Sequence, residues 1–150
     1  QILVKIIKVK KWPPKFTDII FMFQKELGNK IIANNPSQNY GRISILANYR
    51  LNVIDKFFVS SNCFIPKPKV QSMVIHFKPK KNLKLKIKNL DNLEKVTNIF
   101  FSNKRKMINK SLKKVLNDKK IKSIPELDKK LRPENLNTDI FYKITKLMET

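Results

Sequence analysis

The amino-acid sequence predicts an α/β fold in which part of a sheet comes first and a small all-α unit follows. A nearly continuous apolar run over residues 17–24 is typical of a buried strand of a parallel sheet, and it passes directly into a helical pattern over 25–32. Two strand-like runs, at about 52–60 and 70–77, flank a segment with two prolines. Beyond Lys78 the apolar residues recur with the helical period.

The first half of the chain supplies the elements of the predicted sheet. An amphipathic helix covers residues 1–9 and ends before Trp12-Pro13-Pro14. Another helix covers 42–50, with its apolar side chains on one face. In the last strand three apolar residues alternate with Val74 and His76, so one face is expected to be buried. These residues are Met73, Ile75 and Phe77.

The second half is predicted to be helical throughout. Asp91, followed by Glu94 three residues later, indicates an N-cap and capping box for its first helix. Ser102-Asn103 interrupts that helix and starts a second one, which is expected to run to about Leu116. A short helix follows Ser123, and the last begins at about Thr138. We therefore expect two units, residues 1–80 and 81–150.

The charge indicates an anionic partner. The chain has 33 Lys+Arg against 11 Asp+Glu, a formal net charge of +22. Such a charge favours nucleic acid first and an anionic membrane surface second. A compositional drift toward Lys, Asn and Ile would also raise the charge without selection for binding, because most of the basic residues are Lys.

Several classes of protein are not supported by the sequence. Lys interrupts every apolar run, so no transmembrane segment is expected, and no signal peptide is visible. The single Cys63 gives no disulfide framework, which favours a cytoplasmic protein. One cysteine and one histidine, His76, cannot supply the ligands of a metal site, so no metal is expected.

The segment Phe64-Ile65-Pro66-Lys67-Pro68-Lys69-Val70, here called the connector, carries the clearest functional signal. Its two prolines fix the backbone, which favours a stiff, extended segment. A rigid aromatic ring beside fixed positive charge suits stacking on an unpaired base while lysines hold its phosphate. The alternative is an ordinary proline-stiffened loop whose Phe64 packs inward.

Five blocks in a fixed order resemble the bacterial dimethyladenosine transferase family. They are Phe21-Met22-Phe23-Gln24-Lys25-Glu26, Tyr40-Gly41-Arg42-Ile43-Ser44, the connector with Ser72, Phe101-Ser102-Asn103-Lys104-Arg105-Lys106, and Leu131-Arg132-Pro133-Glu134-Asn135-Leu136. Macrolide-resistance methylases and mitochondrial transcription-factor relatives share the connector, but the second block and the helical tail favour the small-subunit branch. The resemblance implies the C-terminal part of a Rossmann-like methyltransferase sheet, followed by a small all-α RNA-facing domain. Residues 17–24 would be its fifth strand, and the runs flanking the connector its final antiparallel pair.

The resemblance also implies the activity. Members of the family transfer methyl groups from S-adenosylmethionine to the exocyclic amines of adenines in small-subunit rRNA. The implied partner is small-subunit rRNA or the immature small ribosomal subunit, and the full-length protein would be a monomer. Two alternatives stay open: a non-catalytic nucleic-acid-binding relative on the same scaffold, and a basic structural protein of the ribosome.

One departure from the family concerns the cofactor. Such an enzyme needs a Gly-rich turn after its first strand. This chain has two glycines, Gly28 and Gly41, and neither lies in such a turn. We expect no cofactor-binding residues here; the cofactor loop and the family's Asn-Leu-Pro-Tyr motif would precede Gln1. The chain would then be a C-terminal portion of the enzyme, inactive alone.

Site residues follow from the same resemblance. Phe64 would stack on the target base, and the rest of the connector would form a substrate loop with Pro66, Lys67, Pro68 and Lys69. The residues at the carboxyl edge of the sheet are Gln24, Lys25 and Glu26, although Lys25 and Glu26 also fit an ordinary helix start. Predicted RNA contacts are Arg42, Lys104, Arg105, Lys106 and Lys110, the last four on one basic helix. The alternative is a solvated Lys-rich face, which is favoured most for Lys119, Lys120 and Lys122. Many relatives have Asp at the position of Gln71, whose role the sequence leaves open.

Overall fold

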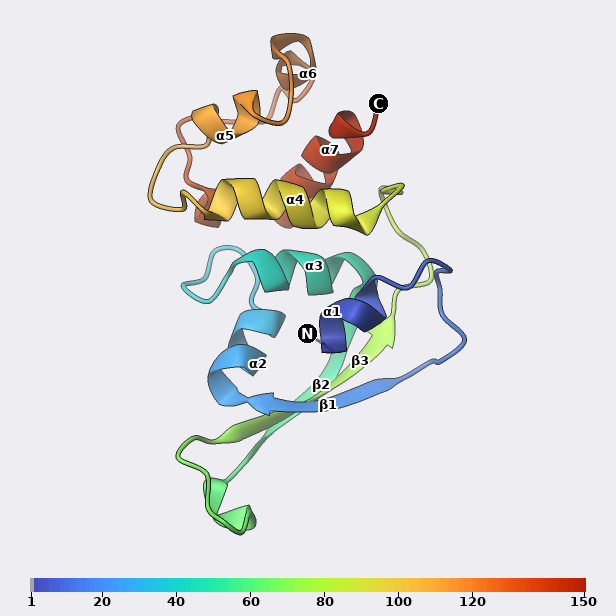
Figure 1. The fold of residues 1–150 in the computed structure, drawn as a ribbon, viewed down its shortest axis with the longest axis vertical. Helices are drawn as coiled ribbons and strands as arrows, with labels where there is room; N and C mark the ends of the chain where they lie inside the picture. The colour runs from blue at the N-terminus through green and yellow to red at the C-terminus, as the bar shows by residue number, and fades with distance from the viewer. Residues whose placement is uncertain (1) are drawn as a thin grey trace.

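A three-stranded antiparallel sheet and two layers of helices make up the structure, a computed structural model that describes residues 2–150 (Figure 1). The elements of the first half are α1 (Ile2–Ile7), β1 (Ile19–Gln24), α2 (Lys25–Ile32), α3 (Arg42–Arg50), β2 (Leu51–Val59), a 3-10 turn η1 (Ser61–Cys63) and β3 (Ser72–Pro79). Those of the second half are α4 (Leu90–Phe101), α5 (Asn109–Lys113), α6 (Asp118–Lys122), η2 (Pro133–Asn135) and α7 (Thr138–Met148). Gln1, the first residue of the predicted N-terminal helix, lies outside the described residues.

The sheet has the order β1-β3-β2, and both pairings are antiparallel. The predicted antiparallel pair on either side of the connector is therefore confirmed. The expected alternation in β3 is also confirmed, since one face is fully buried; its residues are Met73, Ile75 and Phe77.

The strand β1 differs from its prediction. The apolar run predicts a strand buried within a parallel sheet, but within residues 2–150 its one neighbour is the antiparallel β3. Ile20 and Met22 remain 65% and 54% exposed, whereas Ile19 is buried and Phe21 and Phe23 are half-buried. The apolar run is therefore exposed on one face of β1 and only partly buried on the other.

Helix α3 lies between the sheet and the helical half, with α4 and α7 on its other side (Figure 1). Buried apolar residues of the two halves form one continuous cluster around it. One polar contact crosses the same boundary: the hydroxyl of Tyr142 on α7 donates to the carbonyl oxygen of Ile45 on α3, at 3.0 Å. The helical half therefore packs on the sheet through α3.

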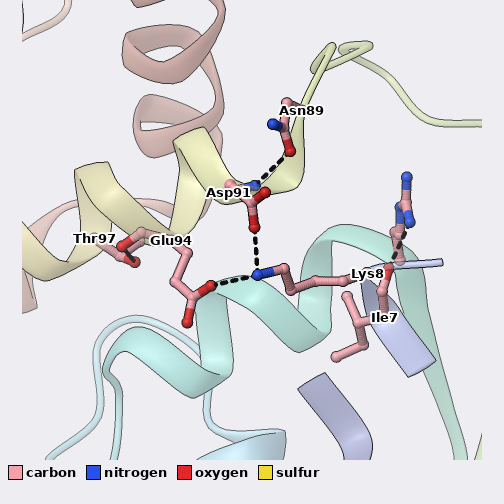
Figure 2. Close-up of polar contacts among 7 residues, drawn as sticks. Ile7, Lys8, Asn89, Asp91, Glu94 and Thr97 are labelled. Atoms are coloured by element: carbon pink, nitrogen blue, oxygen red, sulfur yellow. Dashed lines mark hydrogen bonds and ion pairs between the residues drawn. The ribbon is translucent and has the colours of Figure 1, made fainter. Parts of the chain in front are cut away.

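The predicted capping box at the start of α4 is wrong. The N-cap is Asn89, whose side-chain oxygen accepts a hydrogen bond from the backbone N–H of Asp91 at 2.9 Å. Asp91 and Glu94 instead hold the ammonium of Lys8, which follows α1, and the Lys8–Glu94 distance is 2.9 Å (Figure 2). The local spacing fitted a cap, but a lysine distant in sequence uses both carboxylates.

Two helix predictions in the second half are also wrong. Residues 102–107 form a turn followed by irregular backbone rather than the start of a helix, and α5 begins only at Asn109. The next helix, α6, precedes Ser123 instead of following it, because Asn117 caps it by accepting from the N–H of Lys120 at 2.9 Å. The last helix begins at Thr138 as predicted.

No helix among residues 2–150 combines the length and the apolar character needed to cross a membrane.

The contact of Lys8 with α4 predicts a pH-dependent contribution to stability. The hydrogen bond between the Lys8 ammonium and the Asp91 carboxylate lowers the pKa of Asp91 and raises the pKa of Lys8. Asp91 therefore stabilises the fold at pH values above the pKa that an aspartate has in the unfolded chain, about 3.9. This stabilisation is lost as the pH falls through the lower pKa of the folded state. Lys8 stabilises the fold at pH values below the pKa that a lysine has in the unfolded chain, about 10.4. This stabilisation is lost as the pH rises through the higher pKa of Lys8 in the folded state.

Replacing Lys8 by methionine should therefore lower the urea midpoint of unfolding at pH 7, and the difference from the wild type should shrink as the pH is lowered toward 2. Lys5→Met is the matched control, because Lys5 is exposed on α1 and makes no ion pair among the described residues. A difference that stays constant between pH 7 and pH 2 would contradict the ion-pair explanation.

Gly28 predicts a second effect on stability. A Cβ at this buried position of α2 would lie 2.7 Å from the sulfur of Met73, which is 1% exposed. Overpacking costs about 1–3 kcal/mol, whereas alanine in place of a helical glycine gains about 1 kcal/mol. The same Cβ would lie 3.2 Å from the Met73 Cβ, a contact that alanine at position 73 keeps. Gly28→Ala should thus be destabilising in the wild type and clearly less so in a Met73→Ala background, as a double-mutant cycle of urea unfolding would show. An equal cost in both backgrounds would exclude the clash with the Met73 sulfur.

Candidate functional site

The end of β1 and the connector meet at one end of the sheet. The register places Gln24 of β1 and Val59 of β2 on either side of Ser72 of β3. The backbone N–H of Lys25 donates to the carbonyl of Gln71 at 2.9 Å, and its ammonium donates to the Gln71 side-chain oxygen at 2.9 Å. The Lys25 ammonium also lies 5.0 Å from the ring centroid of Phe58, within cation–π range.

The partner of Gln71 in the structure is Lys25, which the sequence around Gln71 does not predict. Lys25 and Gln71 are 46 residues apart, so no local pattern could have found the pair. The two residues line a shallow pocket together with Gln24, Glu26, Asn29 and Val70. The structure thus brings all three predicted sheet-edge residues to the C-terminal end of the connector.

The connector begins directly after the turn η1, with Phe64 as the C-cap residue of the turn. Ser60 caps the turn by accepting from the N–H of Asn62 at 3.2 Å, and the N–H of Phe64 donates to the Ser61 carbonyl at 3.3 Å. Phe64 is half-buried and is not part of the hydrophobic core cluster. The connector residues after it are exposed, except for Pro68, which is half-buried.

Glu26 is engaged within its own helix. It accepts a hydrogen bond from the ammonium of Lys30, one helical turn later, at 2.6 Å. This hydrogen bond lowers the pKa of Glu26. The contact supports the alternative interpretation of Glu26 as an ordinary helix-start charge.

The basic residues after α4 do not lie on one helix, which corrects the prediction. Lys104, Arg105 and Lys106 lie in a hydrogen-bonded turn, in which the N–H of Lys106 donates to the carbonyl of Asn103 at 2.9 Å. All three side chains are exposed, as is that of Lys110 on α5. None of these four residues has an ion-pair partner within the part of the chain that the structure describes.

Arg42 opens α3 on the same side of the molecule as this basic turn. Tyr40 packs edge-on against Phe101, the last residue of α4, with ring centroids 6.4 Å apart. In Figure 1 the start of α3, the end of α4 and the end of β1 all lie on the left side, with the hairpin that holds the connector below them. Arg42 is half-buried, and its Nε has no hydrogen-bond partner among residues 2–150.

A methyl-donor site does not fit the residues of this chain. Gly28 is buried within α2 against Met73, and Gly41 is the N-cap residue of α3, so neither glycine leaves a cradle after a strand. Among the described residues no group of three or more His, Cys, Asp or Glu side chains could hold a metal ion. The described residues supply surfaces that could hold an aromatic base and phosphates.

Comparison with known proteins shows the family to which the chain belongs. The family model described as Ribosomal RNA adenine dimethylase matches residues 1–150. The chain is 41% identical over 135 residues to Ribosomal RNA small subunit methyltransferase A of Pelagibacter ubique (strain HTCC1062), covering 89% of this chain and 51% of that protein. It is 34% identical over 149 residues to the protein of the same name from Allorhizobium ampelinum, covering 99% and 53%. The chain thus spans about half the length of the curated relatives it matches.

Two solved structures resemble the fold. The crystal structure of a dimethyladenosine transferase from Plasmodium falciparum superposes with a TM-score of 0.72 at 26% identity, over 88% of this chain and 57% of that one. The 23S rRNA methyltransferase ErmE superposes with a TM-score of 0.63 at 14% identity, over 93% and 57%, which shows a shared fold alone. The family match over the whole chain confirms the resemblance seen in the sequence, and the chain belongs to the ribosomal RNA adenine dimethylase family.

Proposed function

We propose that the protein containing this chain transfers methyl groups from S-adenosylmethionine to the exocyclic amines of adenines in small-subunit rRNA. The observation that supports the proposal best is the meeting of β1 and the connector at one end of the sheet, on the side that also carries the exposed basic turn. The names of the relatives favour methyl transfer over the non-catalytic alternative. The methyl donor would be bound by residues outside this chain.

The residues of this chain would bind and orient the substrate. Adenine's exocyclic amine is a poor nucleophile, so the base must leave its stack and be held in line with the methyl group. Phe64 would support one face of the extruded adenine, and Pro66 and Pro68 would keep that ring in place. Lys67 and Lys69 would contact the neighbouring phosphates, and the Lys25–Gln71 contact would fix the far end of the connector against the sheet.

The helical half would hold the RNA by its backbone. We propose a sheet unit over residues 1–80 and an RNA-facing helical unit over 81–150. Lys104, Arg105 and Lys106 would contact phosphates rather than read bases, since duplex RNA is recognised mostly by shape and backbone. Arg42 and Lys110 would extend this contact on either side of the turn.

Methyl transfer to small ribosomal subunits tests the proposal. The full-length protein would be incubated with unmethylated small subunits and S-adenosylmethionine carrying a labelled methyl group, and the rRNA then digested to nucleosides. We expect label in methylated adenosine. RNA binding without any transfer would leave the non-catalytic alternative.

A further inference from the structure

A hollow of about 540 Å³ lies far from the connector, where the sheet half meets the helical half. Its walls come from the segment after α2, the end of α3, the start of β2, the segment after β3 and the start of α7. At that end of the sheet Leu51 pairs with Pro79, whereas the connector joins the opposite ends, Val59 and Ser72. At about 3.3 Å per residue along β2, roughly 25 Å separates the two ends. We call this hollow the interdomain pocket.

Positive charge in the interdomain pocket exceeds the negative charge. Lys80, Lys81 and Lys84 line it, and Asp139 is the one acid among its described lining residues. The Lys84 ammonium lies 4.0 Å from the Asp139 carboxylate, and these side chains are 89% and 51% exposed, so the pair is weak. Lys80 donates to the carbonyl oxygen of Asn48, and burial lowers its pKa. Lys80 is half-buried and Lys81 and Lys84 are exposed at the rim, and such a group of lysines with so little counter-charge is suited to an anion.

The remaining walls carry side-chain amides and apolar groups. Asn34, Asn52 and Asn82 line the pocket and can both donate and accept hydrogen bonds, as base edges require. Leu83 and Leu85 add half-buried apolar surface. The volume lies within the range of about 300–1,000 Å³ typical of small-ligand sites.

Tyr49 and Tyr142 form the floor of the interdomain pocket, and their hydroxyls already make hydrogen bonds within the protein. The Tyr49 hydroxyl donates to the Leu85 carbonyl at 2.8 Å and accepts from the N–H of Ile87 at 2.9 Å. The Tyr142 hydroxyl is likewise used by its bond to α3. Lys81, Asn52 and Asn82 make no side-chain hydrogen bond among the described residues and can bind a ligand, as can Lys84 and Asp139, whose mutual ion pair is weak.

We propose that the interdomain pocket holds one unpaired nucleotide of the bound RNA, at a distance from the methylated adenine. Lys81 and Lys84 contact its phosphate, and Asp139 accepts from an exocyclic amine of its base, as acidic side chains do with cytosine. The inference rests on the proposed function for the identity of the RNA. An unpaired nucleotide fits better than an acidic peptide, because amides and an acid line the pocket beside the lysines.

RNA binding by the full-length protein tests the pocket. The probe is a fluorescent single-stranded RNA of ten nucleotides, titrated between 50 and 200 mM salt and followed by anisotropy. The double variant Lys81→Gln/Lys84→Gln should bind about five- to twentyfold more weakly, with a salt slope smaller by about 1.4, since each single-strand phosphate contact contributes about 0.7. Both side chains are exposed, so the fold should be kept, as an unchanged thermal midpoint will verify.

The matched control is Lys119→Gln/Lys122→Gln, which removes the same charge from exposed positions of α6. It should leave affinity and slope near those of the wild type. Asp139→Asn should reduce any preference for cytosine-rich over uracil-rich probes. Three outcomes would contradict a nucleotide site in the interdomain pocket. They are equal losses of affinity in the two double variants, an unchanged salt slope in Lys81→Gln/Lys84→Gln, and competition by an acidic peptide but not by RNA.

The two proposals can fail separately. If the wild-type protein transfers no methyl group but its RNA affinity depends on Lys81 and Lys84, the proposed function fails and the pocket stands. If methyl transfer occurs and the double variant binds RNA like the wild type, the pocket alone fails.

Discussion

Replacing Phe64 by alanine in the full-length protein is expected to reduce methyl transfer to small-subunit rRNA by roughly 5- to 150-fold. Stacking of a base on an aromatic side chain is worth about 1–3 kcal/mol, which corresponds to this range. Phe64 is half-buried at the connector and outside the hydrophobic core cluster, so its removal should leave the thermal midpoint almost unchanged. Initial rates with labelled methyl donor, measured at equal cofactor occupancy, check the prediction.

Two further substitutions make the test specific to an aromatic ring. Phe64→Tyr should retain most of the activity, because it keeps a flat ring at the same place. Ile65→Ala is the control for disturbance of the connector, since the Ile65 side chain is 101% exposed and has no packing to lose. If Phe64→Ala turned over as fast as the wild type, Phe64 would have no part in holding the base.

Neutralising the basic turn is expected to have a comparably large effect on binding. The triple variant Lys104→Gln/Arg105→Gln/Lys106→Gln should bind small-subunit rRNA about a hundredfold more weakly at 150 mM salt. Each phosphate contact contributes about 0.7–0.9 to the slope of log affinity against log salt, so the slope should decrease by about 2–3. Filter binding over a series of salt concentrations measures both quantities.

The matched control for the turn lies in the next helix. Lys119→Gln/Lys120→Gln/Lys122→Gln removes the same charge from α6, where sequence analysis favours a solvated face. A salt slope equal to that of the wild type in the variant at residues 104–106 would exclude phosphate contact there. An equal loss of affinity in both triple variants would show that binding depends on the net charge of the protein and not on a contact at residues 104–106.

Elements with a strong local pattern could be predicted from the sequence. The alternation of Met73, Ile75 and Phe77 located β3 because their burial on one face is a direct consequence of the two-residue period of a strand. The ends of α3 were also predicted, and so was the beginning of α7 at Thr138. In these segments local propensity and tertiary packing favour the same structure.

Predictions failed where a distant partner decides the structure. The spacing of Asp91 and Glu94 is that of a capping box, yet both carboxylates bind Lys8, more than 80 residues earlier in the chain. The Lys25–Gln71 contact at the candidate site is invisible for the same reason. After α4, the apolar residues Met107, Ile108 and Leu112 predicted a helix that would also include the basic residues 104–106. Ile108 and Leu112 are indeed buried, but the helix begins only at Asn109 and the exposed basic residues lie in a turn before it.

Photo-crosslinking of the RNA to the protein can locate the methylated base directly. Unmethylated small subunits carrying a photoactivatable adenine analogue at the methylated position would be irradiated with the full-length protein and a non-reactive analogue of the methyl donor. Mass spectrometry would then identify the crosslinked peptide. We predict a crosslink within residues 60–71, the peptide that contains Phe64, and its loss in Phe64→Ala. A crosslink confined to the helical half would contradict the placement of the adenine at the connector.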